Sequence, residues 1–337
     1  MAEGLYHGSK AVNYLYIGSV KLYERPVAPN SIRFQFINND LTLETLVAGT
    51  PEGFGTWTPM DGNGNVFDFT KTTTSWAGAS NKSVLIGLKD ASNKVLLSYH
   101  DFNVLDTNFY GVTDLTHLFR TSSTPYFKLH TCKLGFTNDV TTFQNAFTNC
   151  TSLTSVDMIN SESAETFNSM FMGCTALTSL QPFTDTAVLE NTSYMFSGCS
   201  SLVTAPVIYT DSVTTMRQMF RDCTSLTTVP DYATENVRLF GAETGTTTTS
   251  GMFYGCTSLE DLPEFSYNSA VSVLGMFRGC TNAKTGLTRE YNKMAVAAGI
   301  TNCDQAFTNC GANTAEGLAQ RQDIPESWGG DMIEEFG

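Results

Sequence analysis

Apolar residues return along the middle of the chain at a spacing of i, i+3 and i+4, with polar residues between them. The copies of this pattern are Leu115, Leu118, Phe119; Phe143, Ala146, Phe147; Phe167, Met170, Phe171; Met216, Met219, Phe220; and Val273, Met276, Phe277. Residues at this spacing lie on one face of an α-helix. The pattern therefore predicts a short helix with one apolar stripe in each copy.

A cap and a short strand follow each stripe. The stripe ends at Gly-Cys or Asn-Cys, as at Asn149-Cys150, and glycine and asparagine readily adopt the left-handed conformation that ends a helix. Short extended segments such as residues 153–156 come next and predict a strand. Proline follows the strand in three copies, where a missing N–H donor does least harm, at Pro206, Pro230 and Pro263.

The whole unit repeats. Successive phenylalanines lie 28, 24, 25, 24, 33, 24 and 30 residues apart. One unit cannot bury its own stripe, but stacked units bury it against their neighbours, so a period in the twenties predicts a repeat solenoid with a short helix and a short strand per turn. We expect the repeat core to contain Phe119, Phe147, Phe171, Phe196, Phe220, Phe253, Phe277 and Phe307, with Cys150, Cys174, Cys199, Cys223, Cys256, Cys280 and Cys310.

The repeated string Met-Phe-x-Gly-Cys-x-Ser-Leu resembles the leucine-rich repeats of the BspA-like class, which occur in bacterial and protist surface proteins. Residues 112–315 carry the resemblance. It implies a leucine-rich repeat solenoid whose strands line one face and whose repeats present a binding surface for proteins or glycans. The class shares no catalytic residues, so the resemblance implies none here.

Residues 1–30 read as a separate hairpin segment. Two short apolar runs flank Gly18-Ser19, and glycine at the first turn position suits a type II′ turn. A lone hairpin is unstable in water, so it either supplies the first strands of the next domain or serves as an anchor and oligomerisation segment. In the second case the assembly contacts would come from Tyr14, Tyr16, Ile17, Val20, Leu22 and Tyr23. Residues 14–23 also resemble N-terminal segments of structural proteins from phages of gut Bacteroidetes.

Residues 31–111 are rich in strand signals, with alternation at residues 32–36 and short apolar runs at 66–69, 84–86 and 95–97. We expect a β-rich N-terminal cap that covers the open end of the solenoid, and a small independent β-domain is the alternative. Asp61-Gly-Asn63-Gly-Asn65 resembles the start of a calcium loop. However, Val66 stands where that loop needs glycine and Thr72 where it needs glutamate, so a simple turn is the favoured interpretation.

The longest gap between phenylalanines predicts an insertion at residues 233–250, which would form a loop on one face of the stack. Several aromatic residues lie outside the core positions. They would either stack on glycans or pack on the strand side. They are Tyr209, Tyr232, Tyr254 and Tyr267.

The C-terminal part predicts a longer helix at residues 287–298, ended by Gly299. A last irregular repeat follows around Phe307. Residues 316–337 are expected to form a C-terminal cap with an acidic tail, in which Trp328 covers the final turn.

Composition narrows the range of partners. The 337 residues carry a net charge of −14 with 15% charged residues, which disfavours binding to a nucleic-acid backbone. No run of 18 apolar residues predicts a membrane helix. The N-terminal residues lack the basic and apolar regions of a signal peptide, which favours a protein made in a cytoplasm and released by another route, as virion proteins are.

Nine cysteines would suggest disulfides or a metal site in other contexts. Seven of them share one repeat position, Cys303 lies at the leading stripe position, and only Cys132 stands outside the pattern. This distribution predicts a column of buried thiols, which act as small apolar groups. The four histidines are scattered, so the sequence predicts no metal site and no cofactor.

No catalytic motif is evident. The sequence lacks a phosphate-binding loop, His-Glu-x-x-His and Gly-x-Ser-x-Gly. Glu260 and Asp261 could serve as paired carboxylates for glycoside hydrolysis, but nothing in the sequence distinguishes them from other acidic residues. We therefore expect a protein that is not an enzyme.

The sequence as a whole favours a non-enzymatic virion protein, such as a head or tail fibre or a decoration protein. The N-terminal segment would bind other virion proteins, and the solenoid would bind a host-surface glycan or protein. A homo-oligomer, such as a trimer, fits this role. A bacterial cell-surface adhesin or interaction scaffold is the alternative, and a polysaccharide-degrading enzyme is the third hypothesis. Fold alone does not decide among them.

Overall fold

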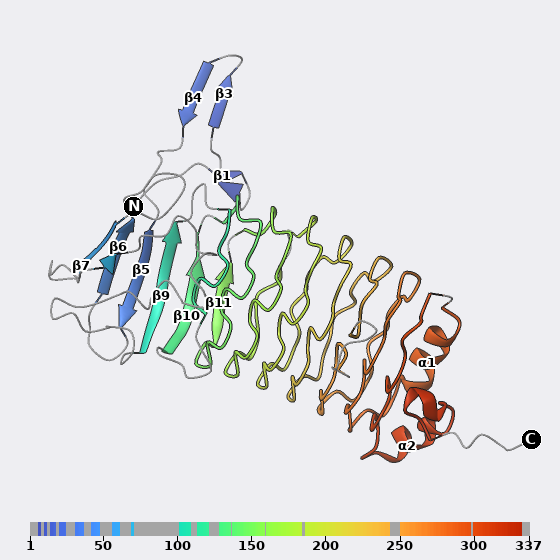
Figure 1. Cartoon of the computed structure of the whole chain (residues 1–337). Helices are drawn as coiled ribbons and strands as arrows, with labels where there is room; N and C mark the ends of the chain where they lie inside the picture. The colour runs from blue at the N-terminus through green and yellow to red at the C-terminus, as the bar shows by residue number, and fades with distance from the viewer. Residues whose placement is uncertain are drawn as a thin grey trace, which may run out of the picture.

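The computed structural model describes residues 6–7, 10–11, 14–17, 20–24, 31–36, 42–47, 56–60, 69–70, 101–108, 113–120, 128–135, 137–158, 160–183, 186–242, 250–297 and 299–331. From residue 113 onward these segments form a row of coils that lie side by side (Figure 1). Two helices lie at the far end of this row.

Two small strand pairs precede the coils. β1 (Tyr6–His7) pairs with β2 (Lys10–Ala11), and β3 (Tyr14–Ile17) pairs antiparallel with β4 (Val20–Glu24). The β3–β4 hairpin projects away from the coil row (Figure 1). It occupies the residues where the sequence predicts a hairpin, whereas the turn itself, at residues 18 and 19, lies outside the described residues.

A seven-stranded sheet joins the N-terminal strands to the first coils. Its order is β11-β10-β9-β5-β6-β7-β8. The strands are β5 (Ser31–Phe36), β6 (Thr42–Val47), β7 (Thr56–Met60), β8 (Phe69–Thr70), β9 (Asp101–Asn108), β10 (Lys128–Leu134) and β11 (Ser155–Met158). β5 pairs antiparallel with β9, and β9 pairs parallel with β10. The sheet therefore changes from antiparallel to parallel at β9, where the coils begin. The predicted apolar runs at 84–86 and 95–97 and the loop at 61–65 lie outside the described residues.

Eight successive coils are connected by parallel bridges. Seven such bridges form one line across the row, through Asp114, Thr142, Thr166, Asn191, Thr215, Leu239, Ser272 and Asn302. Threonines on exposed positions add a second link, because their hydroxyls donate to carbonyls of the preceding coil. Thr175, Thr224 and Thr257 each do so at 3.3 Å. The abundance of threonine thus contributes hydrogen bonds between coils.

The segments that carry the apolar stripe differ from the predicted short helices. Among the described residues the α-helices are α1 and α2, which lie near the C-terminus, and the stripes are runs of turns. In the coil around Phe147, the N–H groups of Phe143, Asn145, Phe147 and Asn149 donate to carbonyls of the next coil at 2.7–3.1 Å. Between them, the N–H groups of Ala146 and Thr148 donate three residues back, and the N–H of Gln144 donates to Thr142 Oγ1. Every second donor thus serves the neighbouring coil, which an α-helix would not allow.

Two left-handed residues shape six of the runs of turns, which are those around Phe147, Phe171, Phe196, Phe220, Phe277 and Phe307. One lies two residues before the phenylalanine, and the other lies two residues after it. Around Phe147 these are Asn145 and Asn149, with φ of 57° and 62°. The position two residues after the phenylalanine confirms the left-handed caps predicted at glycine and asparagine, which are Asn149, Gly173, Gly198, Gly255, Gly279 and Asn309. Asp222 adopts the same conformation, which was not predicted. Because both residues bend the chain inward, side chains at i, i+3 and i+4 reach the core without a helix.

The phenylalanines form a continuous aromatic column. All eight are fully buried. From Phe147 to Phe277 consecutive rings stack nearly parallel, with centroids 5.3–5.6 Å apart and interplanar angles of 4–13°. The column tilts at both ends, by 36° at Phe119 and 30° at Phe307. Stacked aromatic rings at this distance contribute beyond the burial of their area.

A column of thiols runs beside the rings. The cysteines at the repeat position are free and buried. Six of them donate an S–H bond at 3.0–3.2 Å to the carbonyl of the phenylalanine in the preceding coil, namely Cys150, Cys174, Cys199, Cys223, Cys256 and Cys280. The thiols therefore link coils by hydrogen bonds as well as filling space.

Thiol reactivity gives the first prediction. Burial raises the pKa of Cys199 to about 12 and raises the pKa of Cys132, Cys174 and Cys223 well above the usual range. Thiolate is the reactive species, so we expect a maleimide at pH 8 to label the half-buried Cys303 alone in the native protein.

Counting labels by mass spectrometry checks this result. Denatured protein, as the control, should take up nine labels. Rapid native labelling at several cysteines would contradict the buried column.

The predicted insertion is shorter than expected. Leu239 forms bridges with both Thr215 and Ser272, and the Phe240 N–H donates to Ser272 at 3.0 Å. Residues 233–242 therefore belong to a coil, and the prediction that the insertion starts at residue 233 is wrong. Residues 243–249 lie outside the described residues. The chain re-enters the stack at Gly251, where a Cβ would lie 2.4 Å from the Met276 Cα, so only glycine fits.

The C-terminal end closes the row of coils. α1 (Leu287–Ala295) confirms the predicted helix but ends earlier, and α2 (Ala315–Arg321) and the 3₁₀ helix η3 (Glu326–Trp328) follow. The Trp328 carbonyl accepts the Phe307 N–H at 2.8 Å, where a further coil would otherwise supply an acceptor. Its ring packs edge-on against Tyr291. Trp328 thus covers the final turn, as predicted. No helix in the described part of the chain is long and apolar enough to cross a membrane.

Candidate functional site

A polar hollow lies where the last coils meet α1. Its volume is about 530 Å³. Two neighbouring coils and the helix supply its lining, which consists of Thr227, Thr228, Val229, Asp231, Asp261, Leu262, Pro263, Glu264 and Arg289.

The coil register creates this hollow. Asp261 forms a parallel bridge with Thr285 of the next coil, and the Thr285 hydroxyl donates to its carboxylate. After Thr285 the chain leaves the coil path at Gly286, which has φ of 91° and would place a Cβ 2.9 Å from the Leu262 Cβ. This left-handed residue turns α1 over the edge of the hollow.

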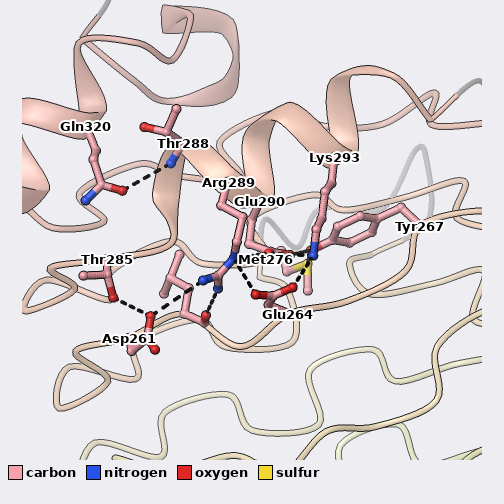
Figure 2. Close-up of polar contacts among 11 residues, drawn as sticks. Asp261, Glu264, Tyr267, Met276, Thr285, Thr288, Arg289, Glu290, Lys293 and Gln320 are labelled. Atoms are coloured by element: carbon pink, nitrogen blue, oxygen red, sulfur yellow. Dashed lines mark hydrogen bonds and ion pairs between the residues drawn. The ribbon is translucent and has the colours of Figure 1, made fainter.

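Arg289 on α1 is the central cation of the site (Figure 2). Its Nε lies 2.9 Å from Glu290 Oε1 and 3.6 Å from Glu264 Oε1, and its Nη1 lies 4.0 Å from Asp261 Oδ1. Its Nη2 donates to the Leu262 carbonyl. These contacts fix the guanidinium on one wall of the hollow, because a planar fork with several partners has little rotational freedom.

Glu290 holds Arg289 from the buried side. Its side chain is fully buried. The Tyr267 hydroxyl donates to Glu290 Oε2 at 2.8 Å, and Lys293 Nζ lies 3.5 Å from Oε1. A buried carboxylate is tolerated only when it is paired and hydrogen-bonded. Burial, together with the negative charge of Glu290, raises the pKa of Tyr267 well above its usual range, so its hydroxyl keeps the proton that it donates.

Glu264 is held in its ionised form. Lys293 Nζ lies 2.9 Å from Glu264 Oε2. This hydrogen bond, followed by the positive charges of Lys293 and Arg289, lowers the pKa of Glu264. The carboxylate is therefore a hydrogen-bond acceptor at neutral pH and has no proton to donate as a general acid.

The lining offers more acceptors than donors. The carboxylates of Asp231, Asp261 and Glu264 face the hollow with the hydroxyls of Thr227 and Thr228. Three apolar residues complete the surface. A ligand rich in hydroxyl groups would supply the missing donors and place its C–H groups on the apolar part. Within the described residues, no three His, Cys, Asp or Glu side chains are grouped so that they could hold a metal ion.

The sequence identified one part of this site. Asp261 lies in the lining, whereas its neighbour Glu260 lies outside it and pairs with Lys284 at 2.7 Å. Glu264, Arg289 and Lys293 were missed. Arg289 and Lys293 lie four residues apart on the predicted helix, which is the one signal that the sequence offered. Their acidic partners Asp261 and Glu264 lie 25 to 29 residues earlier in the chain, and only the register of the coils brings them close in space.

The four aromatic residues outside the repeat core have different environments. Tyr232 and Tyr267 are buried, as expected for packing residues. Tyr209 is 52% exposed. Tyr254 is half-buried between two arginines. The four do not form one glycan-stacking surface.

The β3–β4 hairpin, which contains the predicted assembly residues, lies at the opposite end of the row from α1 (Figure 1). Tyr14, Tyr16 and Ile17 belong to β3, whereas Val20, Leu22 and Tyr23 belong to β4. Their side chains lie outside the described part of the structure.

The chain matches one sequence family. The family described as "Mycoplasma protein of unknown function, DUF285" matches residues 113–229 and 184–291, two overlapping segments that cover more than half of the chain. Both segments lie in the row of coils. This match is compatible with the resemblance to BspA-like repeat proteins. No curated protein and no solved structure matches the chain.

Proposed function

Because the chain belongs to the DUF285 family, and because its hollow is built for polar contacts, we propose that it is a non-enzymatic protein that binds a hydroxyl-rich ligand at a surface. The ligand class is a host-surface glycan or the glycan of a surface protein. The row of coils would be a leucine-rich repeat solenoid with a β-rich N-terminal cap. The parallel bridges and the repeat spacing support this fold class.

The observation that carries the proposal is the fixed set of acceptors in the hollow. Asp261 and Glu264 are both anchored by Arg289, which is itself held by the buried Glu290. Such preorganised groups bind a ligand without first losing side-chain freedom. The lowered pKa of Glu264 supports binding over acid catalysis.

We further propose that the chain is part of a virion, as a head or tail fibre or a decoration protein. The N-terminal hairpin would bind other virion proteins or sister chains in a homo-oligomer such as a trimer. Its projection away from the coils supports this role (Figure 1).

A bacterial cell-surface adhesin is the second candidate, and the family match favours it, since repeats of this kind are typical of surface proteins.

Asp261→Asn tests the binding site. The substitution removes one charge from a side chain that is 73% exposed, so the fold should persist. We expect the affinity for a glycan selected from a panel of immobilised uncharged oligosaccharides to fall about tenfold, because one charge-assisted hydrogen bond is weakened. Biolayer interferometry with the full chain measures the change.

Glu235→Gln is the matched control, since Glu235 is exposed and lies outside the lining. It should bind as the unmodified chain does. Equal binding by Asp261→Asn and the unmodified chain would exclude the hollow as the site. Hydrolysis of any oligosaccharide in the panel would contradict a non-enzymatic role.

A further inference from the structure

A second polar feature runs along the turn side of the coils. It crosses five successive coils and consists of stacked arginine and tyrosine side chains joined by glutamines. We call it the arginine–tyrosine strip, and it comprises Tyr194, Arg217, Gln218, Arg221, Tyr254, Arg278 and Gln305.

The centre of the strip is a tyrosine between two guanidinium groups. Arg221 Cζ and Arg278 Cζ each lie 5.6 Å from the centroid of the Tyr254 ring. They come from the coils before and after Tyr254, so they cover both faces of the ring. Contact with an aromatic face restricts the motion of a guanidinium without using its N–H donors.

Hydrogen bonds extend the strip in both directions. Arg221 Nη1 donates to Gln218 Oε1 at 3.3 Å, and Gln218 Nε2 donates to the Tyr194 hydroxyl at 3.5 Å. Arg217 Cζ lies 5.5 Å from the Tyr194 ring. At the other end, Arg278 Nη1 donates to Gln305. The side chains therefore support one another across coils.

The position in the repeat keeps this row on the surface. Arg221, Tyr254 and Arg278 each follow a buried phenylalanine directly, and the Arg221 side chain is 39% exposed. Beneath them the rings of Phe220, Phe253 and Phe277 lie 5.5 and 5.6 Å apart, so the row has the same regular spacing. The first coil also carries an arginine at this position, Arg120, but the next three coils carry Thr148, Met172 and Ser197 and so interrupt the row.

Two guanidinium groups held in register suit a chain of repeating anionic groups. Each planar fork can bind a carboxylate or sulfate through two N–H donors. A nucleic acid fits poorly, because it requires a broad positive surface. The strip contains three arginines, and one of them, Arg221, lies 3.1 Å from Asp222. It is therefore a narrow positive row on a chain of net charge −14, not a broad positive surface.

We propose that the arginine–tyrosine strip binds an acidic polysaccharide, one that bears carboxylate or sulfate groups along its length. The polymer lies along the coil row and contacts Arg221 and Arg278 through its anionic groups. This site is separate from the acidic hollow, whose carboxylates would repel such a ligand.

The test uses the full chain and three immobilised polymers, which are polygalacturonate for carboxylates, dextran sulfate for sulfates and dextran as the uncharged probe. We expect binding to at least one charged polymer and none to dextran. The double variant Arg221→Gln/Arg278→Gln should bind the charged polymer at least tenfold more weakly. Arg221→Lys/Arg278→Lys keeps the charge but loses the planar fork, so its affinity should fall between the two.

Arg238→Gln is the control for general loss of charge, because it removes one positive charge, against two in the double variant, from an exposed residue outside the strip. It should bind nearly as the unmodified chain does. A purely structural strip would lower the thermal midpoint of the double variant and leave polymer binding intact, which would overturn the proposal. Equal weakening by Arg238→Gln, equal binding to dextran, tighter binding to duplex DNA, or no binding to either charged polymer would also overturn it.

Discussion

Phe220→Ala is expected to lower the free energy of unfolding by about 4 kcal/mol, the middle of the range for removal of a buried aromatic ring. Phe220 is fully buried in the middle of the aromatic column. Its ring lies 5.5 Å from both Phe196 and Phe253 and 6.4 Å from Tyr232. The substitution leaves a cavity and removes stacking on both sides, and the rigid hydrogen-bonded turns prevent collapse into the space. Urea denaturation followed by circular dichroism measures the loss.

Phe220→Leu is the matched control for this cavity. It keeps most of the volume but loses the aromatic contacts, so we expect a loss of about 1–2 kcal/mol. The difference between the two variants separates the cavity from the stacking. A loss below about 1 kcal/mol for Phe220→Ala would show that the coils can close around the missing ring.

Arg321→Met is expected to lower the free energy of unfolding by about 3 kcal/mol, because charge-assisted hydrogen bonds to buried carbonyls are lost. Arg321 is 7% exposed. Its Nη1 donates to the carbonyls of Phe307 and Cys310 at 3.0 and 3.3 Å, and its Nε and Nη2 donate to Asp331 at 2.6 Å. Methionine preserves the apolar stem but removes the side-chain donor of the Cys310 carbonyl and leaves the Phe307 carbonyl with only the Cys310 N–H, 2.9 Å away. The same denaturation experiment measures the effect.

Arg238→Met provides the comparison, since this arginine is exposed, and its effect should stay within about 0.5 kcal/mol. The ion pair also gives a pH dependence. The hydrogen bond from Arg321 lowers the pKa of Asp331 below its usual value of 3.8. A lowered carboxyl pKa stabilises the fold above the unfolded value, and this contribution disappears as the pH falls through the folded value. In Arg321→Met this part of the acid sensitivity should vanish, and an unchanged acid transition would argue against the pair.

The columns of the repeat could be predicted from sequence because one residue type recurs at one position. Phenylalanine and cysteine return at a nearly constant period, and so do the glycines and asparagines with positive φ. Burial and backbone chirality act locally on each residue, so their signal survives without knowledge of the partner coil.

The local backbone of the stripe could not be predicted in the same way. A helix and a run of turns give the same apolar spacing, and the two differ in where the N–H groups donate. At Asn145 the acceptor is the Asn168 carbonyl, 23 residues away. The missed signal is the left-handed position two residues before the phenylalanine, which carries Asn145, Ser169 and Gln218 in different coils. Because the residue type at this position varies, a search for glycine does not find it.

The candidate site was harder to predict than the fold elements. The helix that carries Arg289 was predicted, but its place over the hollow depends on Gly286 and on the register of Asp261 with Thr285. Likewise, nothing in the local sequence distinguishes Arg321 from an ordinary surface arginine at the end of a short helix. Its partners are the carbonyls of Phe307 and Cys310. Every residue has a backbone carbonyl, so the residue types cannot show which carbonyl accepts the bond.

The one-way hydrogen bonds of the turns have a consequence for the length of this protein. In the coils around Phe147, Phe171, Phe196 and Phe277 four N–H groups donate forward, and the carbonyls that receive them occupy the same positions relative to the next phenylalanine. Coils of this kind can therefore follow one another without a mismatch at the junction. Duplication or deletion of a whole coil changes the reach of the protein in fixed steps and preserves both ends, whereas a cut within a coil breaks the ladder on two sides. The number of coils can therefore change in evolution without altering the hairpin at one end or the Trp328 closure at the other.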